Sequence, residues 1–525
     1  MKKYTMLTLA AALTAGTASA QNLVDAVRFG SSDLGGTARY RSMAGAFGAL
    51  GGDPSCMGDN PAGLAIYRGT NVLTITPNLS FTTTETNGSS KEKLKNDNSS
   101  VANMTGIFSF KDPDSDNLVN FTLGIGFERR QENFRKYNVN LTNPTSSLGN
   151  YLTEQANNYL HDNNYYASTL GTTGAWSSDA PLLSLMAYET FAIDDDPNDN
   201  YSVYNPVEGL RAEQFSRVVE KNRHDEYNIS GSFNFNDVFY VGANMKITDF
   251  NSTLTSQFDE LYPTSPDDAL YYDNELETKG SGIGFNVGLL WKVTDEWRLG
   301  AAVHTPTWMN MKEIFSAYIE TKFINQENQK DGLYSEYTDS WEYDFRTPWE
   351  YQFSTAYVFG TRAILSLEWD MRDFTTMKYS TSENYYMKHD AFDEINKAIQ
   401  NRTQIQNTYK AGLEYRLSKN LSARVGYAYV TSPYEKSAML SNVGNYDQYL
   451  LYSSSNKLNY STLDDQQYIT GGLGWRGSNW YFDLSCVYHT MNEYVAAYPA
   501  DYADSNIIDM SQSRYNWDLT IGYRF

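Results

Sequence analysis

Apolar and polar residues alternate along most of this chain from Thr70 onward, and the final stretch shows the pattern best. One face carries Tyr515, Trp517, Leu519, Ile521, Tyr523 and Phe525, and the other carries Arg514, Asn516, Asp518, Thr520, Gly522 and Arg524. Period-two alternation predicts a β-strand with one apolar face. Because the polar set mixes charges of both signs with glycine, it suits a water-filled lumen, while the apolar set suits lipid.

The same alternation predicts about fourteen strands, an even number as in single-chain bacterial barrels. We place them at 70–84, 100–111, 117–139, 223–236, 238–258, 275–293, 296–318, 337–359, 361–380, 404–417, 419–432, 464–477, 479–495 and 510–525. A strand of a soluble sandwich alternates too. The aromatic Phe525 at the end of the last strand resembles the C-terminal signature of bacterial outer-membrane barrels. That resemblance implies the barrel-assembly machinery as a partner.

The connections between these strands sort by parity. Those after odd strands are long, at 85–99, 140–222, 259–274, 319–336, 381–403, 433–463 and 496–509, and those after even strands are tight. Outer-membrane barrels have long extracellular loops and short periplasmic turns. We therefore predict an all-β, antiparallel transmembrane barrel of about fourteen strands in the outer membrane, with both chain ends periplasmic.

Three parts follow from this interpretation. Residues 1–20 form a signal peptide, 21–69 a small N-terminal plug inside the lumen, and 70–525 the barrel with large loops at 140–222, 381–403 and 433–463. The signal peptide has a basic start, a short apolar core and Ala18-Ser-Ala20 before the expected cleavage site. Two loop segments have helical periodicity: Val207, Leu210, Phe215, Val218 and Val219, and then Phe392, Ile395 and Ile399 within 390–402.

Composition agrees with a membrane barrel. The chain has 42 Tyr, 25 Phe and 10 Trp, more aromatic side chains than a soluble core needs, and aromatic girdles would use them. Outside the signal peptide, no apolar run approaches the ~20 residues of a helical membrane span. The formal net charge of −22 argues against nucleic acid as a partner.

Candidate chemistry is sparse, and we expect no enzyme, no cofactor, no metal and no catalytic residue. The five histidines lack His or Cys neighbours at metal-binding spacing. The acidic run 194–200 lacks the glycine and terminal glutamate of an EF-hand loop, so a solvated loop is favoured over a calcium site. Cys56 and Cys486 are expected to stay unbridged. Cys486 lies in phase with the lipid-facing side chains of its strand, away from the plug that carries Cys56.

Charges of both signs fall in the lumen phase of the strands. They are Glu128, Arg130, Lys246, Lys292, Arg298, Glu368, Asp370, Lys410, Glu414, Arg424, Asp483, Arg514 and Asp518. A porin would use such charges for ion selectivity. A plugged barrel would use them to hold the plug, whose possible partners are Arg39, Arg41, Asp53 and Asp59.

The plug itself carries the most specific motif. Residues 30–63 contain nine glycines, and glycine permits tight turns and close backbone approach. The segment from Gly45 through Asp53, with Gly48, Gly51 and Gly52, is followed by Asn60-Pro61-Ala62-Gly63-Leu64 and then by the first strand. These motifs resemble those of the outer-membrane long-chain fatty-acid and aromatic-hydrocarbon transporters (the FadL/TodX/OmpP1-like family). His304-Thr-Pro-Thr307 and Arg346-Thr-Pro-Trp349 are further echoes.

The resemblance implies a mechanism. A hydrophobic molecule, a fatty acid or a hydrocarbon, is caught by extracellular loops, passes to a pocket in the barrel and leaves through an opening at a kink in the third strand. Candidate ligand-binding residues are Leu23, Val24, Phe29 and Phe47, and Gly124 and Gly126 are candidates for the kink. Outer-membrane lipids are further partners, and a monomer is expected. The alternatives are a surface-anchored binding barrel and a narrow porin, each with a static plug.

Overall fold

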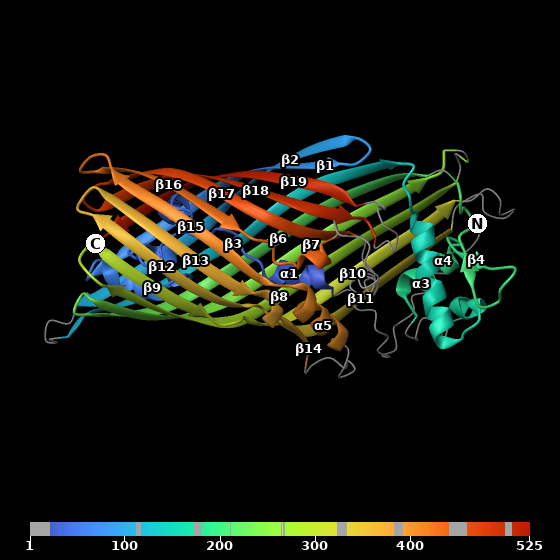
Figure 1. Ribbon diagram of the computed structural model, residues 1–525, viewed down its shortest axis with the longest axis horizontal. Coiled ribbons are helices and arrows are strands. Elements are labelled where there is room, and N and C mark those ends of the chain that lie inside the picture. The colour runs from blue at the N-terminus through green and yellow to red at the C-terminus, as the bar shows by residue number, and fades with distance from the viewer. Residues whose placement is uncertain are drawn as a thin grey trace, which may run out of the picture.

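The computed structural model describes residues 22–111, 117–172, 180–210, 212–263, 265, 268–322, 333–382, 392–439, 459–498 and 507–525. The predicted signal peptide lies outside the described residues. The chain forms one long antiparallel barrel, with a short N-terminal segment inside it and helices gathered at one end (Figure 1).

The barrel wall is a single 17-stranded sheet that β1 and β19 close. Its strands are β1 (Val72–Asn87), β2 (Lys91–Lys111), β3 (Leu118–Thr142), β6 (Glu213–Phe235), β7 (Phe239–Leu261), β8 (Ala269–Lys292), β9 (Trp297–His304), β10 (Trp308–Lys322), β11 (Leu333–Arg346), β12 (Trp349–Phe359), β13 (Ala363–Asp373), β14 (Lys378–Thr381), β15 (Ile405–Arg416), β16 (Leu421–Val430), β17 (Tyr460–Arg476), β18 (Trp480–Ala496) and β19 (Ile508–Arg524). Three crossings are each interrupted once, at β9/β10, β11/β12 and β13/β14. The wall therefore has fourteen crossings, which confirms the predicted fold class.

Two of the interruptions lie side by side in the wall. They fall at Thr305–Thr307 and Thr347–Pro348, within the two Thr-Pro motifs. Proline has no N–H to give to a ladder, so a break there leaves no donor unpaired. The backbone N–H of Thr347 donates to the carbonyl of Thr307 at 3.1 Å, and the N–H of Thr307 donates to Oγ1 of Thr347 at 2.8 Å. These bonds keep the wall continuous across both breaks.

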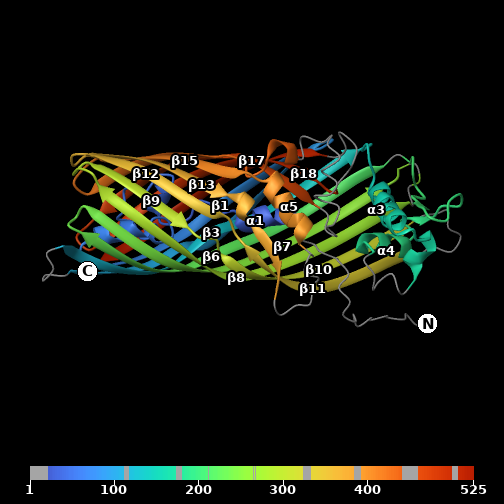
Figure 2. The same cartoon turned by 60° about the horizontal axis from the view of Figure 1, so that its bottom comes forward.

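The two ends of the barrel differ. At the end that holds the C-terminus, β6–β7, β8–β9, β12–β13, β15–β16 and β17–β18 are joined by tight turns. The other end carries α3 (Leu148–Asn163), η3 (Ala167–Gly171), α4 (Leu182–Glu189) and the short pair β4 (Asp194–Asp195) and β5 (Val203–Tyr204) (Figures 1 and 2). We assign the helical end to the cell exterior because extracellular loops are the longer ones.

Several strands are longer than the sequence predicts. Residues 85–99 are not a loop, because β1 and β2 stay paired out to Asn87 and Lys91. The connection expected at 140–222 spans 143–212, because β3 and β6 continue beyond the apolar band as polar strands. The helix predicted from Val207 to Val219 is wrong for the same reason, since most of that segment belongs to β6. The helix predicted within 390–402 is confirmed as α5 (Asp393–Arg402).

The acidic run 194–200 forms tight turns on the helical end. The backbone N–H of Asn198 donates to Asp196, and the N–H of Tyr201 donates to Asp199. The Tyr201 N–H and the hydroxyl of Ser202 lower the pKa of the Asp199 carboxyl. No group of three or more His, Cys, Asp or Glu side chains among the described residues could hold a metal ion. Across the residues that the structure describes, no helix is both long and apolar enough to cross a membrane.

The N-terminal segment folds inside the barrel. It contains α1 (Leu23–Gly30), α2 (Ala38–Ser42), η1 (Pro54–Met57) and η2 (Pro61–Tyr67). Each begins at a residue whose side chain accepts a hydrogen bond from the following backbone: Asn22, Thr37, Asp53 and Asn60. α1 lies about midway along the barrel, and the rest of this plug lies toward the end that holds the C-terminus (Figure 1).

Candidate functional site

Ion pairs tie the plug to the lumen wall. Arg41 pairs with Asp518, whose side chain is fully buried, and Arg39 pairs with Glu414 at 3.0 Å. Asp33 of the plug pairs with Arg514 of β19 at 2.6 Å. The sequence anticipated that Arg39 and Arg41 hold the plug, and these contacts confirm it.

The two plug aspartates accept hydrogen bonds and form no ion pair among the described residues: Asp53 within the plug, and Asp59 from the barrel wall. Asp53 accepts hydrogen bonds within the plug, from the Thr37 hydroxyl at 2.8 Å and from the Ser55 N–H at 3.0 Å. Asp59 accepts a hydrogen bond from Nε2 of Gln352 at 2.6 Å. Burial raises the pKa of the Asp59 carboxyl to about 7, although Lys410 opposes the shift. This carboxyl therefore gains and loses its proton near neutral pH.

The Asn60-Pro61-Ala62 motif fits against glycines of the wall. Nδ2 of Asn60 donates to the carbonyls of Gly48 and Leu289, at 2.8 and 3.0 Å. A Cβ atom on Gly288 would lie 1.9 Å from Asn60 Oδ1, and one on Gly242 would lie 2.4 Å from the Pro61 carbonyl carbon. Sequence reasoning missed these wall glycines, because nothing local to β7 or β8 marks them as contacts of a distant motif.

Glycines of the plug motif serve the same close packing. Gly45, Gly51 and Gly52 have φ of +76°, +64° and +69°, the left-handed region that glycine adopts without strain. Gly48 donates its N–H to Oε2 of Glu368 at 2.7 Å. The α-carbons of Gly51 and Gly63 leave no room for a side chain on either, since an added Cβ would come within 2.9 Å of the other residue.

Gly124 and Gly126 do not mark the bend in β3. They pair regularly with Ile107 and Thr105 of β2, and the space above them is filled by Met57 of the plug. The register of β3 with β6 shifts at two other places, between Leu118 and Asn120 and, higher up, between Arg129 and Gln131. The expectation for the kink residues is therefore wrong, because these glycines serve contact with the plug and the extra residue of the bulge is Arg130.

Above this bulge, the wall opens between β2 and β3. Their ladder runs from Lys111–Asn120 to Asn103–Glu128 and stops there. Beyond that point β2 pairs only with β1, and β3 pairs only with β6. The register of β1 and β2 shifts at the same height, between Thr76 and Pro77. We call this break the β2–β3 window.

The far side of the window is closed by the tip of the β1–β2 hairpin. Nδ2 of Asn96 donates to the carbonyl of Phe134 at 3.1 Å, and the N–H of Ser89 donates to the carbonyl of Asn140 at 2.8 Å. The window is thus a bounded gap in the wall and not a frayed edge.

A cavity of about 150 Å³ lies beside α1 in the lumen. Its wall includes six basic and six acidic side chains: Arg28, Arg130, Arg135, Arg372, Lys410 and Arg514, with Asp33, Asp59, Glu220, Glu350, Asp370 and Glu493. Val24, Val27, Ala44 and Met491 add apolar surface. Charges of both signs make the cavity polar, and Val24 and Val27 give it an apolar patch beside α1.

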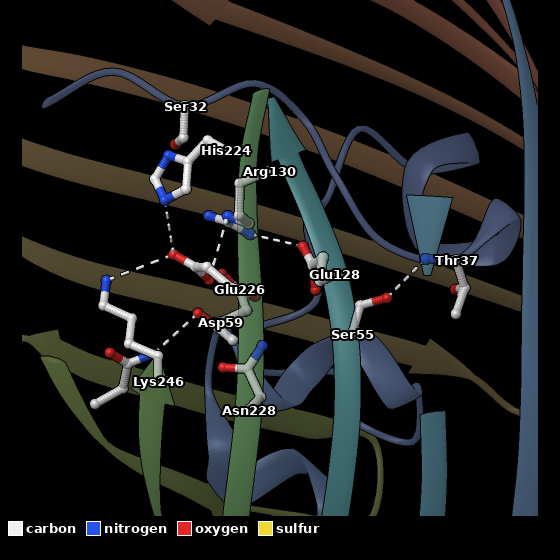
Figure 3. Close-up of polar contacts among 12 residues, drawn as sticks. Ser32, Thr37, Ser55, Asp59, Glu128, Arg130, His224, Glu226, Asn228 and Lys246 are labelled. Atoms are coloured by element: carbon white, nitrogen blue, oxygen red, sulfur yellow. Dashed lines mark hydrogen bonds and ion pairs between the residues drawn. The ribbon is translucent and has the colours of Figure 1, made fainter. Parts of the chain in front are cut away.

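Figure 3 shows the ion pairs around Arg130, one of the residues that line this cavity. Its guanidinium lies 2.9 Å from Glu128 and 3.8 Å from Glu226. Lys246 also lies 3.8 Å from Glu226, and His224 lies 3.7 Å from it. A single bulge residue therefore connects two buried carboxylates beside the window.

A second, smaller cavity of about 30 Å³ lies between the large one and the window. It is lined by Asn78 and Ser100 of β1 and β2 and by residues 129–132 of β3. Both cavities share the lining residues Asp33, Leu34, Arg130, Gln131, Tyr468 and Arg514. The lumen beside α1 and the break in the wall thus adjoin the same side chains.

The candidate ligand residues separate into different places. Val24 lines the large cavity. Leu23 and Phe29 belong to a large apolar cluster above it, where the Phe29 ring lies 5.2 Å from Phe250 and 5.5 Å from Phe345. Phe47 lies in the core of the plug beneath the Arg39 guanidinium. The charged lining was missed as a set, since its members come from strands far apart in sequence.

His489 and the two cysteines lie in packed surroundings. His489 stacks on Tyr468 and lies 2.9 Å from Gln466 and 3.1 Å from Arg514. Cys56 and Cys486 are both free thiols. These groups are polar or packing elements of the lumen and wall.

Comparisons with known proteins agree with this architecture. Residues 211–467 match the family model described as outer membrane protein transport protein (OMPP1/FadL/TodX). The solved structure of a Pseudomonas aeruginosa FadL homologue is similar, with 13% identity, 94% of this chain and 99% of that chain covered, and a TM-score of 0.54. The toluene transporter TodX of P. putida is similar over the same shares at 13% identity and a TM-score of 0.52. No curated protein sequence matches the chain.

Proposed function

Since the chain belongs to the outer membrane protein transport family (OMPP1/FadL/TodX), we propose that it carries long-chain fatty acids inward across the outer membrane and releases them sideways. In this proposal a molecule is caught among the extracellular elements, enters the cavity beside α1, and leaves through the β2–β3 window. Transport of hydrophobic small molecules is the activity of the family, and the cargo and route are the parts proposed here.

The observation that carries the proposal is the shared lining of the two cavities. Arg130 and Gln131 border the lumen cavity on one side and the window on the other. A cargo released at the lower edge of the window, next to Phe127 at the top of the apolar band, can enter the membrane, where each CH₂ group gains about 0.8 kcal/mol over water. The plug fills the lumen below this height, so a sideways exit is shorter than one along the barrel axis.

The chemistry of the cavity favours an amphiphile over a hydrocarbon. Nε of Arg130, a donor, and Oε1 of Gln131, an acceptor, are buried and have no hydrogen-bond partner among the described residues. An ionised carboxylate can accept from the arginine, and a protonated carboxyl can donate to the amide oxygen. A buried polar atom without a partner costs free energy, and a hydrocarbon offers it none. A fatty acid has a polar carboxyl group for this lining and an acyl chain for the apolar patch at Val24 and Val27.

Capture would use the apolar surface above the cavity. The cluster around Phe29 and Phe250 extends to α3 and α4. We call these helices, with η3, the extracellular cap. A small cavity of about 20 Å³, lined by Tyr137, Val139, Val495 and Ile508 among others, opens within the same region. An acyl chain can displace water from such a surface before it reaches α1.

Uptake by cells tests the proposed cargo. A strain lacking its own transporter is supplied with the wild-type chain or with Gln131→Leu, which keeps the size of the side chain and removes its polar atoms. We expect labelled long-chain fatty acid to enter cells that carry the wild type. Its uptake should be about tenfold lower with Gln131→Leu, while toluene uptake should be equal in the two strains. Fatty-acid uptake at the level of the empty strain would refute the cargo.

The alternative is a surface-anchored barrel with a static plug. The ion pairs of Arg39, Arg41 and Asp33 with the wall favour it, because each one resists movement of the plug. A static plug without transport predicts that neither fatty acid nor toluene enters the complemented strain.

A further inference from the structure

The outward face of β2, β3 and β6 carries basic side chains above the apolar band. On β6 the band runs from Phe235 to Tyr227, whose side chains are exposed. Beyond it, the exposed positions belong to Arg223, Lys221 and Arg217. Exposed lysines on the neighbouring strands include Lys136 of β3 and Lys95 of β2. In a chain of net charge −22, this concentration of positive charge is local.

Two of these lysines flank one aromatic ring, and a third lies on the adjoining strand β2. Phe134 pairs in register with Lys221, whose Nζ lies 5.3 Å from the centre of the Phe134 ring. Nζ of Lys136 lies 5.2 Å from the same centre. The hydrogen bond from Asn96 to the Phe134 carbonyl brings β2, and with it Lys95, to this point. We call Lys95, Lys136 and Lys221 the three-lysine site.

These lysines differ from their basic neighbours in having no acidic partner. Most nearby carboxylates are already engaged: Glu85 with Lys91 and Lys93, Asp225 and Glu132 with Arg129, Asp249 with Arg223, and Asp259 with Arg217. Asp97, exposed on β2 two residues from Lys95, forms no ion pair among the described residues. Among the described residues, no ion pair reaches any member of the three-lysine site. Ammonium groups held near one ring repel each other unless an anion lies between them.

The opposite side of the wall has the reverse character. Its outward positions above the band include Asp273, Glu275 and Glu277 of β8, Glu320 of β10, and Glu336 and Glu342 of β11. The lysines on that side are paired: Lys279 with Glu277, Lys312 with Glu342 and Lys322 with Glu320. Among the described residues, Lys95, Lys136 and Lys221 of β2, β3 and β6 thus form no ion pair, whereas these lysines of β8 and β10 each form one.

The height of the site matches a layer of lipid head groups. The Phe127 and Tyr227 rings, 5.6 Å apart, mark the top of the apolar band on β3 and β6. Phe134 lies about 15 Å higher, at roughly 3.3 Å per residue and a strand tilt of about 40°. The outer leaflet of a bacterial outer membrane carries glycolipids whose phosphate groups lie on their sugars, just above the acyl chains.

We propose that the three-lysine site binds a phosphate group of an outer-leaflet glycolipid and so holds that lipid against the wall beside the β2–β3 window. The ammonium groups supply charge-assisted hydrogen bonds to phosphate oxygens. Phe134 holds two of the ammonium groups through cation–π contact until the phosphate arrives. The acyl chains of the lipid lie along the apolar band directly below. This inference does not depend on the cargo.

Native mass spectrometry of the full chain in detergent micelles tests the site. The probes are a phosphorylated lipopolysaccharide, the same lipid after enzymatic dephosphorylation, and inorganic pyrophosphate. The site variant is K95Q/K136Q/K221Q, and the matched control is K279Q/K312Q/K322Q, which removes the same charge from the acidic side. A third variant, K95R/K136R/K221R, keeps the charge.

We expect the wild type, the control and the arginine variant to bind the phosphorylated lipid alike, and the glutamine site variant to bind it at least tenfold more weakly. Dephosphorylation should lower binding to the wild type by a similar factor, and pyrophosphate alone should bind weakly. Equal binding by the site variant and the control would overturn the proposal. Equal binding of the phosphorylated and dephosphorylated lipids by the wild type would also overturn it.

Discussion

At the scale of single residues, the plug is held by ion pairs, and the most buried of these joins Arg41 to Asp518. Asp518 accepts hydrogen bonds from Asn78 at 2.7 Å and Ser485 at 2.8 Å in addition to its pair with Arg41. This arrangement satisfies a carboxylate that would otherwise be costly to bury. The sequence identified the participants by type and phase. It could not assign the partners, because a plug residue and its strand lie hundreds of positions apart.

Removing Arg41 tests the weight of this contact. Arg41→Ala leaves the fully buried Asp518 without its cation, and we expect a loss of about 3–5 kcal/mol in the free energy of unfolding. Urea unfolding from lipid vesicles measures it. Arg68→Ala is the control, because the Arg68–Asp237 pair is exposed and should cost about 0–1 kcal/mol. Equal losses in the two variants would contradict this account.

The wall glycines make a second prediction at this scale. A methyl group on Gly242 meets the Pro61 backbone, and overpacking of this kind costs about 1–3 kcal/mol. Gly242→Ala should lower the unfolding midpoint and raise ion leakage across a bilayer, because the plug no longer fits its wall. Gly231→Ala on β6 is the control, since its added carbon meets only Phe121 at 3.6 Å. A seal as tight as the wild type in Gly242→Ala would count against the fit.

At the scale of elements, period-two alternation predicted the crossings well because lipid enforces it. Outward positions in the apolar band face lipid and therefore favour apolar side chains, so the sequence pattern and the strands coincide there. Above the band that constraint ends, and strands such as β2 from Lys91 to Ser100 continue with polar side chains on both faces. Backbone pairing alone defines those parts, and alternation of hydrophobicity cannot reveal them.

The window was beyond prediction for a related reason. It depends on one extra residue at Arg130 and on a shift at Thr76 and Pro77. A bulge changes the count of residues between two strands without changing the composition of either. Glycine in a strand is a fair signal for a bend, but Gly124 and Gly126 are glycines because Met57 of the plug occupies their side-chain space.

The plug also has an expected dependence on pH. The folded-state pKa of Asp59, about 7, lies above its usual value, so the seated plug favours the protonated carboxyl. Relative to Asp59→Asn, the wild type should therefore lose stability as pH rises from about 4 to about 7 and show no further change above that. Thermal midpoints of both proteins across this range measure the difference. A constant difference at every pH would contradict the shifted pKa.

At the scale of the whole molecule, the barrel combines a sealed lower lumen with a break in its side. The apolar clusters of the plug and wall close the axis, and the cavities beside α1 lead toward the β2–β3 window. Figures 1 and 2 show α1 between the helices of the extracellular end and the rest of the plug. In the proposed route, capture lies above α1 and release lies beside it.

Closing the window tests this account most directly. Ser100→Cys and Glu132→Cys place thiols across it, in a background of Cys56→Ser and Cys486→Ser, and a cleavable bis-thiol reagent links them. Ser109→Cys with Thr122→Cys is the control, since these hydroxyls lie 2.9 Å apart within the intact ladder. We predict that the linker lowers fatty-acid uptake at least tenfold in the window pair, that reductant restores it, and that the control pair transports normally when linked. Undiminished uptake through a linked window would contradict the account.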